Sequence, residues 1–425
     1  MEPCPQVWLP YLEAAQRLGA EAVEVFGWTS VTTTVEFAGN RLHQISQARR
    51  QGCTVRGWWG GRVGLATAGG RVDPQGLAAR ARDGAALGPR QDPCLASVSP
   101  QPARTTQGQI PTREALVAGG EAAIAYCREA VGDVVCSGTW EAVASRWELV
   151  NSEGLVCGQG RQWVDASLVA ERVQGDDWLV VSEGLTAEAT LDPVALAQPV
   201  IQRLQWSQTL SPMPTGILPV LLSPNAVAWW LTPVLAALDA EGVQLGVSPW
   251  GDRRGMAVGA PSLTLYQQPS ARHGLPFDEE GTPTQPFAWI EGGVLQGFYG
   301  DRRHVQAIGE SPRGNGFRNG GVPAPELFHV LIAPGTHTAQ TLSTGAALWV
   351  EAVLGEDPEP GGDFAVSLEL AFRLEDGAIV GRVKDGILAG NVLELLPHVT
   401  LGSDCQWVGS LYTPPWRVES LSLSR

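Results

Sequence analysis

Apolar and polar positions alternate through the first part of the chain in the pattern of antiparallel strands. Residues 9–18 differ, because their apolar positions have helical spacing and stop at Gly19, which predicts an opening helix. Beyond this helix, alternation predicts short strands at 22–26, 32–37, 42–46, 54–58 and 62–66. The segments 38–40 and 59–61 supply turn residues between them. We therefore expect a curved antiparallel sheet beside a helix.

A polar stretch interrupts this pattern at residues 96–111. It is rich in Ser, Pro, Gln and Thr, which bury too little apolar area to pack, so it predicts a linker. Thr112 is placed to cap a helix that runs to about Val131. Strands are then expected at 140–148 and 162–170, and the turn 151–154 lies between them.

A second break, at residues 207–216, sets the predicted domain boundary because it contains Pro212 and Pro214. The prediction is an α+β protein with an N-terminal α/β domain over 1–206, subdivided near the 96–111 linker, and a C-terminal β-rich domain over 217–425. Residues 217–222 form a continuous apolar run, typical of a buried strand. Ser223 and Pro224 then predict the start of a helix that continues to about Ala240. Strands and turns follow to the end, with hairpin turns at 292–293 and 376–377.

Composition favours a folded protein of two domains and excludes one class of partner. The chain has 425 residues, 44% of them hydrophobic and 17% charged, and its 51 glycines and 31 prolines suit a strand-rich fold with many turns. Its net charge of −15 argues against a nucleic-acid partner, since basic side chains dominate binding to phosphates.

Cysteine usage and hydropathy favour a cytoplasmic protein. The seven cysteines form no Cys-x-x-Cys pair, which suits reduced thiols better than a disulfide framework. The first residues lack the basic start and apolar run of a secretory signal. No apolar stretch approaches the roughly 20 residues of a membrane span, so we expect no membrane association.

The familiar catalytic motifs are missing from the sequence. The six histidines include no two that are one helical turn apart, as a zinc peptidase helix requires, although distant residues could still assemble a site. The sequence also lacks a Gly-x-Ser-x-Gly elbow and a dinucleotide-binding glycine pattern. Asp278 and Glu280 lie in a turn-rich segment, where carboxylates usually cap backbone amides. The other interpretation places them inside a substrate chamber.

Several segments, taken in order, resemble the TldD/PmbA family, whose best-known members form a two-subunit metalloprotease. In the N-terminal half the similar pieces are the turn 39–42, the hairpin 53–66 and the Asn-Ser-x-Gly turn at 151–154. In the C-terminal half they are 277–284, 295–302, 314–318, 333–335, 362–364 and 387–391. The resemblance implies an N-terminal α/β domain and a barrel-like C-terminal domain.

The resemblance also implies where a metal would be held. The family's catalytic subunit carries a His-Glu-x-x-x-His helix after a buried strand. The matching helix here has other residues instead, Trp229, Trp230, Leu231, Thr232 and Leu235 among them, and only Cys405 echoes a further zinc ligand. This departure places the chain with the PmbA/TldE-like subunits, so we expect no catalytic residue, metal or cofactor in this chain and zinc in its partner. Six residues are candidates for the substrate chamber: Phe277, Asp278, Glu280, Gly281, Asn315 and Gly316.

Three functional hypotheses follow. The leading one is a non-catalytic cytoplasmic subunit that pairs with a TldD-like metalloprotease, or with a second copy of itself, around an extended or unfolded peptide. A second is an independent hydrolase that acts through distant residues such as His273, Asp278 and Cys405. A third is a homodimeric binding protein that uses part of its set of 16 tryptophans as a contact surface.

Overall fold

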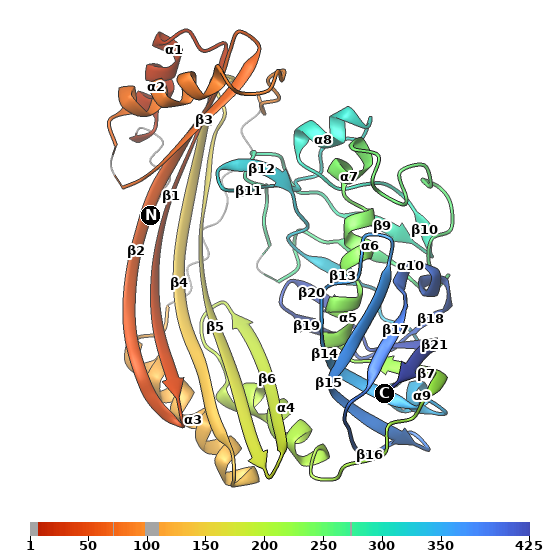
Figure 1. Ribbon diagram of the computed structural model, residues 1–425. Coiled ribbons are helices and arrows are strands. Elements are labelled where there is room, and N and C mark those ends of the chain that lie inside the picture. The colour runs from red at the N-terminus through yellow and green to blue at the C-terminus, as the bar shows by residue number, and fades with distance from the viewer. Residues whose placement is uncertain (1–6, 71, 98–109, 273) are drawn as a thin grey trace.

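A long, curved antiparallel sheet forms the N-terminal part of the protein (Figure 1). The computed structural model describes residues 7–70, 72–97, 110–272 and 274–425. The strand order in this sheet is β3-β2-β1-β4-β5-β6. The bounds are β1 Ala22–Ala38, β2 Arg41–Trp59, β3 Arg62–Gly69, β4 Val135–Asn151, β5 Val156–Gln174 and β6 Asp177–Ala187.

The central strands are longer than the sequence pattern predicted. β1 pairs with β2 continuously from Ala22 to Ala38, with a register shift only after Glu36. The prediction of separate strands at 22–26 and 32–37 was therefore wrong. The β-branched residues between Gly27 and Val35 favour the extended conformation, and pairing on both sides with β2 and β4 keeps the strand unbroken.

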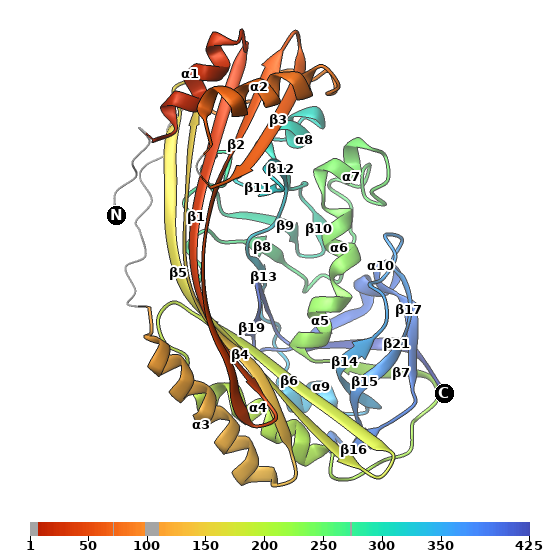
Figure 2. The ribbon, with the colours of Figure 1, turned by 60° about the vertical axis from the view of Figure 1, so that its left-hand side comes forward.

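Helices cover the convex face of this sheet at its two ends (Figure 2). Near one end, α1 and α2 pack on Val23 and Val25, and near the other, α3 packs on Val35 and Phe37 beside α4. Thr112 accepts a hydrogen bond from the amide of Ala115, which confirms the predicted cap. The bounds are α1 Leu9–Arg17, α2 Pro74–Ala85, α3 Arg113–Val131 and α4 Pro193–Trp206. The sequence pattern did not predict α2, and most of the predicted 96–111 linker lies outside the described residues.

The C-terminal part contains a closed barrel. Its strands pair in the order β14-β7-β21-β17-β15, and β15 returns to pair with β14. The bounds are β7 Gly216–Leu222, β14 Leu348–Leu354, β15 Asp363–Glu375, β17 Ile387–Asn391 and β21 Trp416–Ser424, with β16 Ala378–Val383 and β18 Val399–Leu401 attached at β15 and β21. The strand predicted at 217–222 and the hairpin turn at 376–377 are confirmed, but the strand is buried only from Val220 to Leu222, and Ile217 is 73% exposed.

A second, smaller sheet lies beside the barrel with the order β10-β9-β8-β13-β20-β19. Its bounds are β8 Leu265–Gln267, β9 Phe287–Glu291, β10 Val294–Leu295, β13 Val330–Ile332, β19 Gln406–Val408 and β20 Leu411–Thr413. The hairpin β11 Gly316–Asn319 and β12 Val322–Pro325 projects toward the N-terminal sheet (Figure 1). Short helices complete this part: α7 Ala240–Gln244, α8 Arg302–Ala307, α9 Ala339–Ser343 and α10 Val392–Leu395. None of the described helices is long and apolar enough to cross a membrane.

The helix predicted after Ser223 is interrupted. It consists of α5, Pro224–Trp230, and α6, Thr232–Ala237, followed by α7, so the prediction of one helix to Ala240 was wrong in its continuity. Pro233 cannot donate a backbone hydrogen bond, which favours a break just before it. The hydroxyl of Thr232 donates to the carbonyl of Trp229 at 2.8 Å and so satisfies a group exposed by that break.

A buried ion cluster joins the two parts of the protein. Glu24 on β1 forms an ion pair with Arg56 on β2 at 2.7 Å and accepts a hydrogen bond from Arg318 on β11 at 2.9 Å. The side chains of Glu24 and Arg318 are only 3% and 2% exposed. Burial acts to raise the pKa of Glu24, but Arg318 and Arg56 outweigh it and hold that pKa below its ordinary value. The ionised carboxylate of Glu24 therefore links β1 to β11.

We expect Glu24→Gln to destabilise the protein strongly, because it leaves two buried guanidinium groups without their counter-charge. The expected loss in free energy of unfolding is about 3–5 kcal/mol, from urea denaturation followed by tryptophan fluorescence. The control is Glu13→Gln, which breaks an exposed pair with Arg17 and should cost less than about 1 kcal/mol. Equal effects of the two substitutions would contradict this account.

Candidate functional site

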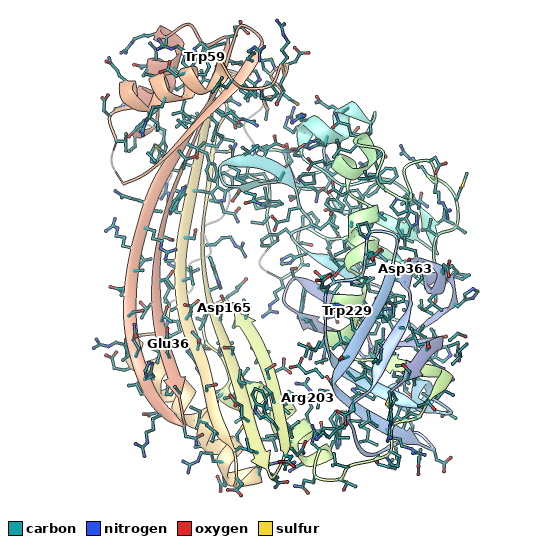
Figure 3. The ribbon with its side chains drawn as sticks, in the orientation of Figure 1. Glu36, Trp59, Asp165, Arg203, Trp229 and Asp363 are labelled. Carbon is teal, nitrogen blue, oxygen red and sulfur yellow. The ribbon has the colours of Figure 1, made fainter. Side chains whose placement is uncertain are left out.

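A cleft of about 720 Å³ separates the N-terminal sheet from the C-terminal part. It is lined by residues of β4, β5, β6 and α4 on one side and by Asn225, Arg272 and β19 on the other. Neighbouring hollows of about 360 and 500 Å³ share Arg203 with it. Figure 3 shows Asp165 and Arg203 on the N-terminal side, with Trp229 in the C-terminal part.

Two edge strands face this cleft. Within the described residues, β6 pairs only with β5, and β19 pairs only with β20. Residues 183–186 of β6 and 406–408 of β19 line the cleft. The unpaired backbone groups of an edge strand can form a ladder with an extended peptide, and such recognition depends little on the peptide's sequence.

The concave wall that continues from the cleft is mostly polar, with small side chains in the middle of β1. Side chains alternate between the faces of a strand, so the residues of β1 that share a face with Phe26 are Trp28, Ser30, Thr32, Thr34 and Glu36. Thr34 donates to Glu141 of β4 at 2.7 Å. Asp165 of β5 accepts from Trp163 at 2.6 Å and from Thr186 at 2.7 Å. A wall of this kind offers hydrogen bonds without a deep apolar pocket.

Arg203 anchors the floor of the cleft, and the sequence analysis did not single it out. Its side chain is 8% exposed and pairs with Glu183 of β6 at 2.9 Å and with Glu351 of β14 at 3.2 Å. The arginine lies in α4 among apolar positions that pack on the sheet. The sequence analysis did not predict α4 either, so the charged residue among the helically spaced apolar positions of this segment was not recognised.

The α5–α6 segment places apolar side chains where the resemblance implied metal ligands. Trp230 and Leu231 are fully buried, and Trp230 packs against Trp416 with ring centroids 5.5 Å apart. Trp229 packs edge-on to Phe364 at 5.3 Å, and Leu235 packs on the same core. These side chains offer no donor that zinc accepts, so the segment does not fit the metal. No group of three or more His, Cys, Asp or Glu in the described residues could hold a metal ion.

Cys405 is poorly suited to act as a nucleophile. Burial, and then the neighbouring Asp404, raise the pKa of its thiol, so the thiolate is disfavoured. Its sulfur lies 3.9 Å from the carbonyl oxygen of Ile332, and no hydrogen bond in the described part of the chain links it to Asp278. His273, the third residue of the hydrolase hypothesis, lies outside the described residues.

The predicted chamber residues lie together at the junction of the two parts. Asp278 is 1% exposed and accepts from the amides of Glu280, Thr282 and Gly316 at 3.0, 2.8 and 2.9 Å. Glu280, 5% exposed, accepts from the amide of Arg302 at 2.7 Å. The two carboxylates therefore organise the loop and its neighbours.

The other four candidates pack around these carboxylates. Phe277 contacts Trp147 edge-on at 5.6 Å, and Asn315 donates to Gln267 at 2.8 Å. Gly281 has a φ of +78°, and a Cβ at Gly316 would lie 2.2 Å from a carboxylate oxygen of Glu280. Both positions thus require glycine. Contact between these residues and a substrate stays a prediction.

Burial makes both carboxyl groups hard to ionise. It raises the pKa of Asp278 to about 7, despite the amides that stabilise its charged form. Burial, and then the Asp278 and Asp301 carboxylates, raise the pKa of Glu280 to about 8. An unfolded glutamate titrates near about 4.3, so between roughly pH 4 and 8 the folded protein holds a proton that the unfolded chain has lost. Stability contributed by this proton is complete at low pH and falls as the pH rises through that window.

Glu280→Gln should flatten this pH dependence, because its amide oxygen can still accept from Arg302 but no longer titrates. For the wild type, the free energy of unfolding should fall by up to about 1.4 kcal/mol per pH unit for each retained proton. The measurement is a series of urea denaturations from about pH 5 to 8. The exposed substitution Glu129→Gln should leave the wild-type slope unchanged. If Glu280→Gln also keeps the wild-type slope, Glu280 is ionised in the folded protein.

Comparisons with known proteins agree with this architecture. Residues 215–425 match a family model described as the PmbA/TldA metallopeptidase C-terminal domain. A metalloprotease TldD homolog from Haemophilus influenzae is 24% identical over 243 residues, 54% of this chain and 49% of that protein. A metalloprotease from Methanothermobacter thermautotrophicus is 26% identical over 202 residues, 46% of this chain and 44% of that protein. The chain thus spans about half the length of the curated relatives that it matches.

The crystal structure of TldE from Thermococcus kodakarensis has the same fold, with a TM-score of 0.87 at 21% identity, over 99% of this chain and 100% of that chain. The likeness extends over both the curved N-terminal sheet and the C-terminal barrel, as the sequence predicted. The family model covers the part that holds α5, the barrel and the 277–284 loop. By the sequence of residues 215–425, the chain belongs to the TldD/PmbA family, and over its whole length it shares the fold of the matched TldE structure.

Proposed function

We propose that this chain is a non-catalytic subunit of a TldD/TldE-like protease, forming part of the wall of a chamber for unfolded peptides. The observation that carries the proposal is the packing of Trp229, Trp230 and Leu231 into the barrel core. A helix that offers tryptophan and leucine to its neighbours cannot activate water through zinc. Cleavage then belongs to a partner of the TldD type, which supplies the metal.

The edges of the cleft support a peptide in extended form. Within the described residues, β6 and β19 each have one edge without a partner strand where they line the cleft, although on β6 the amide of Gly184 donates to the neighbouring Glu183 side chain at 3.1 Å. An added strand gains main-chain hydrogen bonds on β6, and the small side chains of the concave wall leave room for varied side chains. A folded domain cannot pair in this way, because its backbone groups are already satisfied.

The cysteines support a reducing compartment, and we place the protein in the cytoplasm. All six described cysteines are free, and four of them are buried. The partner that completes the chamber is a TldD-like subunit. The independent-hydrolase alternative is disfavoured by the raised pKa of Cys405 and by the packing of Asp278 against backbone amides.

The purified chain alone should contain zinc well below one ion per molecule and should leave a fluorescein-labelled unfolded polypeptide intact. Adding a relative with an intact His-Glu-x-x-x-His helix from the same organism should produce co-elution and cleavage. The control is that relative with its first motif histidine replaced by alanine, which should co-elute without cleaving. Full zinc occupancy together with proteolysis by this chain alone would overturn the proposal.

Peptide addition to β6 can be tested with two neighbouring proline substitutions. In an antiparallel pair, successive residues direct their N–H groups to opposite edges, so Gly184→Pro and Leu185→Pro each remove a donor from a different edge. The amide of Gly184 donates to the Glu183 side chain, so Gly184→Pro acts at the open edge and should weaken binding of an extended labelled peptide about tenfold or more, by fluorescence anisotropy, with little loss of stability. Leu185→Pro should instead lower the unfolding midpoint by breaking the β5–β6 ladder. Unchanged peptide affinity in both variants would exclude β6 as the binding edge.

A further inference from the structure

One long edge of the N-terminal sheet has no neighbour in the described structure. Residues 41–50 of β2 pair with β1 on one side, whereas β3 pairs only with residues 52–59. Every side chain from 41 to 50 is exposed, on both faces of the strand. Leu42 and Ile45 are 43% and 39% exposed. This segment is the β2 edge.

The β2 edge is basic although the protein is acidic. It carries Arg41, His43, Arg49 and Arg50 and no acidic residue, on a chain whose net charge is −15. The adjoining stretch of β1, residues 28–38, contributes one carboxylate, Glu36. Arg41, Arg49 and Arg50 form no ion pair with other described residues, so their charges are directed to solvent.

Charge on an exposed edge strand opposes pairing with an identical strand. Consider a two-fold antiparallel pair centred on Ser46: Arg49 would face His43 of the second copy, and Arg50 would face its Leu42. Arg41 of the second copy, next to that Leu42 and on the same face as Arg50, would then lie within reach of Arg50, and like charges in such positions destabilise the ladder. An edge strand with acidic side chains meets the opposite condition, since each arginine gains a counter-charge.

We propose that the β2 edge is the docking site for a heterologous subunit that adds a strand bearing acidic side chains. The inference rests on the proposed function, because the added strand would extend the concave wall of the peptide chamber beyond β2. Arg41 and Arg50 share the concave face with Glu36 and Ser30, and Arg49 lies on the convex face, so the charges flank the edge on both sides. The same charges that disfavour a second copy select this partner.

An engineered acidic copy of the chain can stand in for the partner. The variant Arg41→Glu/Arg49→Glu/Arg50→Glu changes exposed side chains only and should fold, as circular dichroism would verify. The wild type and this variant should each remain monomeric, whereas an equimolar mixture should associate. In sedimentation velocity at about 50 mM salt, mixed association should be at least about tenfold tighter than either self-association, and the excess should vanish near about 0.5 M salt.

The matched control makes the same charge change elsewhere. Arg17, Arg82 and Arg113 are exposed on α1, α2 and α3, and the variant Arg17→Glu/Arg82→Glu/Arg113→Glu should not associate with the wild type. The inference is overturned if the acidic-edge mixture associates no better than this control. It is also overturned if the wild type forms a dimer that the β2-edge substitutions dissociate, because the occupant would then be a second copy.

Failure of this inference can be separated from failure of the proposed function. The β2-edge substitutions lie outside the residues that line the cleft, so they should leave the peptide affinity at β6 unchanged. Absent mixed association with intact peptide binding would reject only the acidic partner strand. Absent peptide binding by the wild type would reject the chamber itself.

Discussion

The position of one buried carboxylate determines how the rest of the molecule is arranged. Glu24 lies between a guanidinium of its own sheet, Arg56, and one from the C-terminal part, Arg318. The amide of Arg318 also donates to Glu279 at 2.7 Å, and its guanidinium stacks on Phe26 at 4.6 Å. The sheet, the β11 hairpin and the 277–284 loop are therefore fixed to one another through a single cluster.

A second ion cluster holds the opposite end of the sheet. Asp177 of β6 pairs with Arg382 of β16 and with Lys384, the latter at 2.8 Å. The sheet is thus attached to the C-terminal part near both ends (Figure 1), and the cleft lies between these attachments. Buried ion pairs contribute little net stability compared with apolar contacts, but breaking one is costly. Their value here is geometric, because they fix the sheet to the C-terminal part at two separate places.

The sequence predicted local features well and long-range features poorly. The cap at Thr112 and the hairpin turn at 376–377 follow from nearby residues, and both were predicted. The ion cluster was not, because Glu24 and Arg318 are 294 positions apart in the chain. The only available sign was a carboxylate between Val23 and Val25, where alternation alone assigns Glu24 to the exposed face of the strand. The concave face of β1 at Glu24 is instead covered by the β11–β12 hairpin, which is distant in the sequence.

The α5–α6 segment contributes packing at the place where the resemblance implied metal ligands. Metal ligands must keep a donor directed at the ion, which restricts what the neighbouring side chains can fill. Here Trp229 packs on Phe364 and Trp230 packs on Trp416. The barrel core gains aromatic contacts, and only Asn225 of α5 is left to line the large cleft. The segment therefore contributes shape to the barrel core and no ligand for a metal ion.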